Sequence, residues 1–338
     1  MIAWRRLPGS VHNVCHGMRQ LRPTLTSFGN GWVVGTDEHG VVSVPVSRSV
    51  LGAWVAAVRP RQWVKNLLVL AAPATAGALG STSSAMNAVL AVVAFTAAAS
   101  GVYLVNDAAD VDDDRAHPVK CQRPIAAGEI SVRSARQVGV LLGCSAMVLA
   151  VVVNWPLAIV LALYVALTTA YSAGLRNVPV IDIAVVAAGF VARGVAGAVA
   201  VDAAISGWFI SVVSVAAVVI VAGKRVGEMV RVGSAAQRLT LRHYSLRSLT
   251  MLIDGGVCLI AATYLGWAAT GGINGDDAQG SGVMMWLSVL PVIVALARYR
   301  HVARAGGAAT PERLLVTDAV LVAAVVAWCG TFLLGVYW

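Results

Sequence analysis

Residues 86–115 read MNAVLAVVAFTAAASGVYLVNDAADVDDDR. The first 20 of these residues carry no charge, whereas the last ten include five aspartates. A hydrocarbon core of about 30 Å is crossed by about 20 apolar residues in a helix, so the stretch predicts a membrane-spanning helix. The aspartates then form a cluster of carboxylates where that helix leaves the bilayer.

The composition of the whole chain also indicates a membrane protein. Of its 338 residues, 58% are hydrophobic and only 12% are charged, whereas about 25% are charged in ordinary soluble domains. These values exclude a soluble globular enzyme and a disordered protein. The five cysteines are scattered without paired spacing, so they favour neither a disulfide framework nor a metal–thiolate site.

We therefore predict an all-α integral membrane protein with nine transmembrane helices. The apolar stretches of suitable length are 63–80, 86–106, 136–153, 156–172, 180–201, 205–223, 250–270, 283–299 and 315–337. Residues 55–338 are expected to form one nine-helix transmembrane domain. Residues 1–54 are polar, contain no continuous apolar core of a signal peptide, and are expected to form a weakly ordered cytoplasmic tail.

The positive charges predict how the chain is oriented. The net charge is +9, and 24 of the 25 Lys and Arg residues fall on the side of the predicted spans that holds the N-terminus. Because positive residues gather on the cytoplasmic side, we expect a multi-pass protein of the cell (inner or plasma) membrane with the N-terminus inside and Trp338 outside. This explains the basic charge without a nucleic-acid partner. Arg193, inside the span 180–201, is the exception.

The acidic helix end predicts a metal site. At about 100° per residue, its polar positions fall within an arc of about 100° on one helix face. These positions are Asn106, Asp107, Asp110 and Asp114. Converging carboxylates repel one another unless a cation lies between them, and hard oxygen ligands suit Mg²⁺, which shares phosphate oxygens. We therefore expect all four to bind Mg²⁺ and a diphosphate at the cytoplasmic face, with the three aspartates catalytic. A solvated acidic loop is the alternative.

The segment after the aspartates is basic and contains Lys120 and Arg123, followed by Pro124 and Ile125. These two cations could neutralise phosphate oxygens that the metal does not cover. For Lys120 in particular, a role as a simple topology anchor is the alternative.

The string Asn106-Asp107-x-x-Asp110-x-x-x-Asp114, followed by Arg-Pro-Ile at 123–125, resembles the UbiA superfamily of intramembrane prenyltransferases. The resemblance covers about residues 55–338 and implies nine helices around a central cavity. Usual members of the family bind a prenyl diphosphate through Mg²⁺ and alkylate an aromatic acceptor. They carry a second motif, Asp-x-x-x-Asp, of which this chain keeps Asp182 but has Val186 at the second position.

Other segments resemble a narrower branch of the superfamily, the decaprenyl-phosphate phosphoribosyltransferases. These segments are 59–66, 103–107, 222–228, Arg193 with 196–197, and Arg298-Tyr299 with Pro311-Glu312 and Asp318. The branch transfers 5-phosphoribose from phosphoribosyl diphosphate (PRPP) to a long polyprenyl phosphate in the lipid bilayer, and the product feeds arabinan synthesis in cell walls. Its members are thought to form homotrimers, so the resemblance implies a homotrimer here as well.

The basic residues fit such a donor, because PRPP carries a 5-phosphate besides its diphosphate. One face of the sixth span, within about 120°, carries Lys224, Arg225, Glu228 and Arg231. These residues lie at the same membrane level as Lys65 and Asn66. The expected substrate-binding residues are Lys65, Asn66, Asn106, Lys120, Arg123, Tyr171, Arg176, Asp182, Arg193, Lys224, Arg225 and Glu228. For Lys224 and Arg225, topology anchoring is again the alternative.

Arg193 is 11 residues beyond Asp182, so it lies on the same helix face about 16 Å deeper. A charge near the middle of a bilayer is costly and usually faces a polar cavity or a partner. We expect Arg193 to line the cavity, where it contacts either a lipid phosphate or another helix.

The sequence thus favours Mg²⁺-dependent transfer of 5-phosphoribose from PRPP to polyprenyl (decaprenyl) phosphate. Prenylation of an aromatic acceptor from a prenyl diphosphate, as in quinone synthesis, is the alternative within the same fold. A transporter is a third hypothesis, disfavoured because the charges cluster at one membrane face and only Arg193 lies deep.

Overall fold

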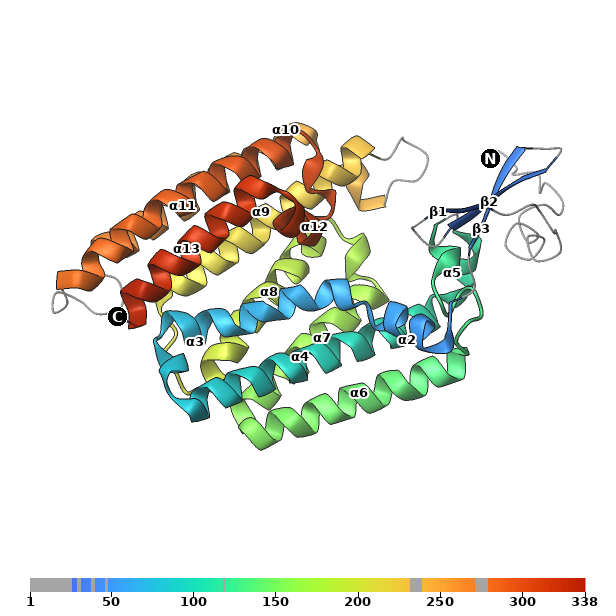
Figure 1. Cartoon of the computed structure of the whole chain (residues 1–338), viewed down its shortest axis with the longest axis horizontal. Coiled ribbons are helices and arrows are strands. Elements are labelled where there is room, and N and C mark those ends of the chain that lie inside the picture. The colour runs from blue at the N-terminus through green and yellow to red at the C-terminus, as the bar shows by residue number, and fades with distance from the viewer. Residues whose placement is uncertain are drawn as a thin grey trace. The chain divides into compact units, whose positions relative to one another are not determined.

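The structure is a computed structural model that describes residues 26–28, 32–37, 40–45, 48–117, 119–231, 239–270 and 279–337 (Figure 1). Eight of the described helices are long and apolar enough to cross a membrane. They are α4 (Thr82–Ala109), α6 (Val132–Val153), α7 (Trp155–Ala173), α8 (Ile181–Ala200), α9 (Gly207–Arg231), α10 (Leu246–Ala269), α11 (Gln279–Arg304) and α13 (Ala319–Tyr337). The prediction of a helical, multi-pass membrane protein is confirmed, whereas the count of nine helices is not.

The first predicted span differs most from expectation. Residues 60–80 do not form one α-helix but three short segments, which are η1 (Pro60–Leu70, a 3₁₀ helix), α3 (Ala71–Thr75) and η2 (Ala78–Gly80). Pro73 lacks an amide donor, and Gly77 has a φ of 67°, which ends the α-helical hydrogen bonding there. Hydropathy does not register these two backbone effects.

The last predicted span is also shorter than expected. Residues 311–317 form a separate helix, α12 (Pro311–Thr317), and α13 starts at Ala319. Asp318 separates the two helices, because its side chain accepts a hydrogen bond from the Leu321 amide at 3.1 Å and pairs with Arg298 at 2.8 Å. A capping carboxylate of this kind begins a new helix.

Three short strands precede the helices. They are β1 (Thr26–Phe28), β2 (Trp32–Asp37) and β3 (Gly40–Pro45), which pair antiparallel in chain order. Valines, which favour extended backbone, occur at five positions of β2 and β3. These strands and the start of α2 (Val50–Val58) fall within 1–54, where we expected weak order. Residues 1–25, 29–31, 38–39 and 46–47 of that tail lie outside the described residues.

The chain divides into two compact units, one formed by 1–60 with 100–142 and the other by 61–99 with 143–338. In the first unit, α2 packs on the second half of α4 and the start of α6, with Ala53, Leu104 and Ile125 in the core. In the second unit, α9 packs along α10, and α11 along α13 (Figure 1). The remaining short helices are α5 (Val111–Ala116), η3 (Lys120–Gln122), η4 (Leu175–Asn177), η5 (Leu239–His243) and η7 (Gly307–Ala309).

Within the second unit, the backbone of α8 lies very close to that of η1 in the irregular segment. A Cβ atom on Gly197 would lie 1.7 Å from the carbonyl oxygen of Val69. One turn earlier, Arg193 Nε donates a hydrogen bond to Asn66 Oδ1 at 2.9 Å. The absence of a side chain at Gly197 therefore lets η1 approach α8 closely enough for this hydrogen bond to form.

We predict that Gly197→Ala destabilises the protein by about 1–3 kcal/mol or more, because backbone atoms must move to make room. The measurement is the melting temperature of the purified protein in detergent. Gly143→Ala in α6 is the matched control, since no heavy atom lies within 4 Å of its Cβ position. Equal melting temperatures for the two variants would contradict the close packing of η1 on α8.

Candidate active site

The acidic cluster of the first unit is neutralised by arginines. Asp107, near the end of α4, is buried, and Arg59 Nη2 donates to its two carboxylate oxygens at 2.6 and 2.7 Å. Arg59 reaches it from the end of α2, where its own φ is 56°, and its guanidinium stacks on Tyr103 at 4.8 Å. A left-handed residue after a helix turns the chain sharply, which places this arginine beside α4.

A second arginine joins two of the predicted aspartates. Arg123 Nη1 donates to Asp107 Oδ1 at 3.0 Å and to Asp114 Oδ2 at 2.6 Å. Lys120 Nζ lies 3.7 Å from Asp114 Oδ1. Asp114 is only 1% exposed, and its Oδ1 has no hydrogen-bond partner among the described residues. One cationic nitrogen thus binds both carboxylates at once, as the predicted spacing requires.

The helix geometry behind that spacing is nearly as expected. α4 ends at Ala109, and Asp110 departs from helical angles with φ −87° and ψ 13°. Hydrogen bonds of the α-helical kind nevertheless continue, from the Asp110 amide to Asn106 O at 2.9 Å and from the Asp114 amide to Asp110 O at 2.8 Å. The predicted residues therefore stay on successive turns.

The cluster fits a hard divalent cation in its donor chemistry. In the part of the chain that the structure describes, no group of three His, Cys, Asp or Glu side chains converges on a point suited to a metal, because Arg123 lies between Asp107 and Asp114. That contact shows that one cation can reach both carboxylates, and Asp114 Oδ1 offers a further oxygen. Carboxylate and amide oxygens are the ligands such ions prefer.

A second group of charges lies in the second unit, around η1. Lys65 Nζ donates to Gln62 Oε1 and lies 3.7 Å from Glu312 Oε2. The pKa of Lys65 is lowered to about 8, chiefly by burial; Glu312 acts to raise it, and the charges of Lys224 and Arg193 act to lower it. The charges of two further cations and one carboxylate therefore act on Lys65, which is an arrangement suited to a phosphate.

Arg193 is buried in α8, only 6% exposed, and is held by uncharged groups. Besides Asn66, it donates to the Gly189 carbonyl at 2.6 Å and to the Tyr164 hydroxyl at 2.9 Å. Its guanidinium also lies over the Tyr164 ring at 4.7 Å. The predicted contact with another helix is present, since Arg193 links α8 to α7 and to η1.

Asp182 and Arg225 form a buried ion pair in the second unit. Arg225 Nη2 lies 2.9 Å from Asp182 Oδ2, and Nη1 donates to Glu228 at 2.7 Å. Asp182 is fully buried and also accepts from the Tyr244 hydroxyl at 2.6 Å. Burial and this hydrogen bond raise the pKa of Tyr244, so it remains a donor. Tyr171 lies 3.5 Å from Arg225.

The sequence reasoning missed several residues of these groups. Arg59, Gln62, Tyr164, Tyr244 and Glu312 all bind predicted site residues. Arg59 and Gln62 stand in a segment already noted for its resemblance. Glu312 is 250 residues from Gln62, with which it shares a hydrogen bond, so no local pattern could have paired them. Arg176, which was predicted, lies half-buried in η4.

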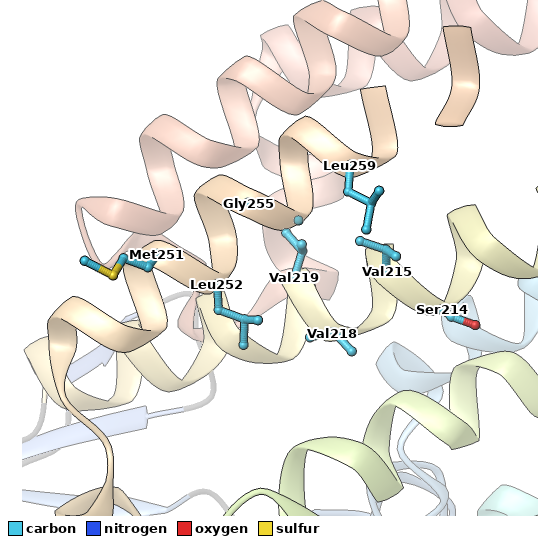
Figure 2. Close-up of a pocket in the computed structure, with 9 residues that line it drawn as sticks. Ser214, Val215, Val218, Val219, Met251, Leu252, Gly255 and Leu259 are labelled. Atoms are coloured by element: carbon cyan, nitrogen blue, oxygen red, sulfur yellow. The ribbon is translucent and has the colours of Figure 1, made fainter. Parts of the chain in front are cut away.

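A hollow of about 410 Å³ lies elsewhere, between α9 and α10. Figure 2 shows Val215 of α9 opposite Leu259 of α10 across it. Its lining is almost wholly apolar and includes none of the predicted site residues. It offers no group for the binding of a phosphate or a metal.

Comparison with known proteins agrees with the motif. The model of the UbiA prenyltransferase family matches residues 67–226. The chain is 37% identical over 303 residues to a decaprenyl-phosphate phosphoribosyltransferase of Mycolicibacterium smegmatis, with 86% of this chain and 94% of that protein covered. A protein of the same name from Corynebacterium glutamicum is 34% identical over 297 residues, covering 86% and 88%.

Among solved structures, a UbiA homolog from Archaeoglobus fulgidus bound to GPP and Mg²⁺ matches with a TM-score of 0.61. It is 18% identical, and the match covers 84% of this chain and 99% of that one. At this identity the likeness concerns the fold alone.

The buried ion pair gives a stability prediction. Arg225→Met leaves Asp182 without its cation in the protein interior, so we expect a loss of about 3–5 kcal/mol in unfolding free energy. Adding Asp182→Asn to that variant should recover part of the loss. Melting temperatures in detergent measure both effects, and a double variant as unstable as the sum of the singles would contradict the pairing.

The control for this measurement is Arg115→Met. Arg115 pairs with Asp112 at 3.3 Å, but the two side chains are 51% and 90% exposed. Exposed pairs contribute little. Arg115 Nε also donates to the Ala126 carbonyl at 3.3 Å, so we expect a fall in melting temperature that is small beside that of Arg225→Met.

Proposed function

The chain belongs to the UbiA prenyltransferase family, and on this premise we propose that it transfers 5-phosphoribose from PRPP to a polyprenyl phosphate. Diphosphate is released in this reaction. The acceptor lipid named in its relatives is decaprenyl phosphate. The similarity to these relatives extends over 86% of the chain.

The observation that carries the proposal concerns Asp182. Members of the family that prenylate aromatic acceptors have a second acidic motif, of which Asp182 is the surviving half. Here Asp182 is fully buried against Arg225, and Val186 packs on an apolar cluster of the second unit. Val186 has no oxygen for a second metal, and the two oxygens of Asp182 face Arg225 and Tyr244. At this position the chain thus has a cation paired with a carboxylate, where those members have two carboxylates.

The cations around η1 suit a donor with an additional phosphate. The charges of Lys224 and Arg193 act on Lys65, and Glu312 provides one negative charge near Lys65 and Lys224. A prenyl diphosphate has a single charged end, whereas PRPP has a diphosphate and a 5-phosphate. We therefore propose that these cations bind a phosphate monoester.

We propose Mg²⁺ as the cofactor, held by Asp107, Asp110, Asp114 and Asn106. When bound, Mg²⁺ would neutralise the charge that develops on the departing diphosphate. Arg123 and Lys120 now contact the carboxylates that would hold the metal. These two side chains are also close enough to donate to diphosphate oxygens when a metal takes over the carboxylates.

The reaction then requires little general acid or base catalysis from the protein. A phosphate oxygen of the acceptor forms a bond to C1 of ribose while the bond from C1 to the diphosphate oxygen breaks. The acceptor oxygen is already anionic, so no strong general base is required. Positioned cations stabilise the leaving charge, which is the main contribution expected of the protein. A single displacement inverts the configuration at C1.

The proposal includes the cellular setting. The protein would lie in the cell membrane with the acidic cluster at the cytoplasmic face, the N-terminus inside and the C-terminus outside, as the positive charges predict. Assembly as a homotrimer is an expectation from the family resemblance alone.

We expect purified protein to transfer label from PRPP to polyprenyl phosphate only when Mg²⁺ is present. Asp107→Asn should lower the rate by about 100-fold or more, because it removes a metal ligand. Asp112→Asn is the matched control, since the Asp112 side chain is 90% exposed. If label from a prenyl diphosphate enters an aromatic acceptor while PRPP is not used, the proposed donor is wrong.

Binding of the metal can be measured without turnover. Mg²⁺ together with diphosphate should raise the melting temperature of the protein, and chelation by EDTA should reverse this. At 100 times the dissociation constant, the stabilisation is about 2.7 kcal/mol. Asp114→Asn should abolish the shift, and an undiminished shift in that variant would exclude Asp114 as a ligand.

A further inference from the structure

Glu312 brings a distant part of the chain to η1. It lies in the first turn of α12, and its Oε1 accepts a hydrogen bond from Gln62 Nε2 at 2.8 Å. Its other oxygen, Oε2, lies 3.7 Å from Lys65 Nζ. The side chains of Lys65 and Glu312 are largely buried, at 25% and 18% exposed. Water therefore screens their interaction less than it would at the surface.

The contacts leave Lys65 with capacity for a ligand. An ammonium group has three N–H donors. One is directed to Gln62 Oε1, and a second faces Glu312. Because Gln62 binds both Lys65 and Glu312, the three side chains form a closed triangle. This arrangement fixes the ammonium and, among the described residues, leaves its third N–H for an anion.

The charges around Lys65 explain why a carboxylate is needed there. The groups that act on it within the described residues are Glu312 from α12, Lys224 from α9 and Arg193 from α8. Burial and the two cations favour the neutral amine, and Glu312 opposes them. Burial alone would raise the pKa of Glu312, but Lys65, Gln62 and Lys224 hold it below its usual value, so Glu312 remains charged.

We propose that Glu312 is a positioning residue that keeps Lys65 charged and aimed for binding of the phosphate monoester of the substrate. Through this contact, Glu312 of α12 determines the pH above which Lys65 loses its proton and substrate binding weakens. The inference rests on the proposed function in one respect, the identity of the anion. The relation between Glu312 and Lys65 is independent of it.

The first experiment measures the ionisation of Lys65 directly. Acetic anhydride modifies neutral amines, so the pH dependence of acetylation at Lys65, read by mass spectrometry on the full-length protein in detergent, gives its pKa. We expect about 8 in the unaltered protein and a lower pKa in Glu312→Gln. The amide oxygen introduced by this substitution can still accept the hydrogen bond from Gln62, so the variant should fold. Glu129→Gln, which alters a carboxylate paired with Arg48, should leave the pKa of Lys65 unchanged.

An unchanged pKa of Lys65 in Glu312→Gln would overturn the proposal whatever the substrate is. If instead the pKa of Lys65 falls but PRPP supports no transfer in the unaltered protein, the proposed function fails while the role of Glu312 toward Lys65 stands.

The second experiment measures KM for PRPP against pH. Losing a nearby opposite charge should lower the pKa of Lys65 by about one pH unit, so near pH 8 the charged fraction falls from about one half to about one tenth. KM should then rise roughly fivefold near pH 8 and little at pH 6.5, with kcat nearly constant. Glu312→Asp should restore part of the profile. If Glu312→Gln raised KM equally at all pH values, or lowered kcat alone, Glu312 would have a purely structural role.

Discussion

A charge enclosed among membrane-spanning helices must have a partner, because neither lipid nor an apolar core can solvate it. This constraint explains most of the polar contacts in the second unit. Arg193 donates to a carbonyl, a hydroxyl and an amide oxygen, and Arg225 forms ion pairs with Asp182 and Glu228. Each arginine fixes the helices that supply its partners. The polar framework is therefore also what holds the helices in register.

The two arginines differ in whether their positive charge is compensated by carboxylates. Arg225 is 1% exposed, and its two Nη nitrogens face carboxylates, so its charge is fully compensated. The hydrogen-bond partners of Arg193 are uncharged, so its positive charge acts on Lys65. A phosphate near Lys65 and Lys224 therefore meets an excess of positive charge. Arg193 therefore adds positive charge to the proposed site, whereas Arg225 has a structural role and links α9 to α8.

The acidic cluster follows the same rule in the first unit. Asp107 and Asp114 would repel each other without a cation, and Arg123 supplies one. The hydrogen bonds of the helical turn continue past Asp110, although its dihedral angles depart from those of a regular helix. Because the hydrogen bonds of the turn persist, the residues chosen from the sequence keep their relation. What the pattern could not show is that arginines from positions 59 and 123 occupy the carboxylates in this arrangement.

The sequence by itself determined six membrane helices to within about five residues at each end, because hydrophobic length and helical spacing are local properties. A seventh, α9, continues eight residues beyond its predicted end, and an eighth, α13, is shorter than predicted. The sequence failed over 60–80, where Pro73 and Gly77 break a segment that is apolar enough to span. Only the tertiary structure decided which charges meet. Glu312 reaches Gln62 across 250 residues, and Asp182 proved to be the counter-ion of Arg225. Such pairings depend on how helices pack in three dimensions, and a side chain's own neighbours in the sequence do not encode them.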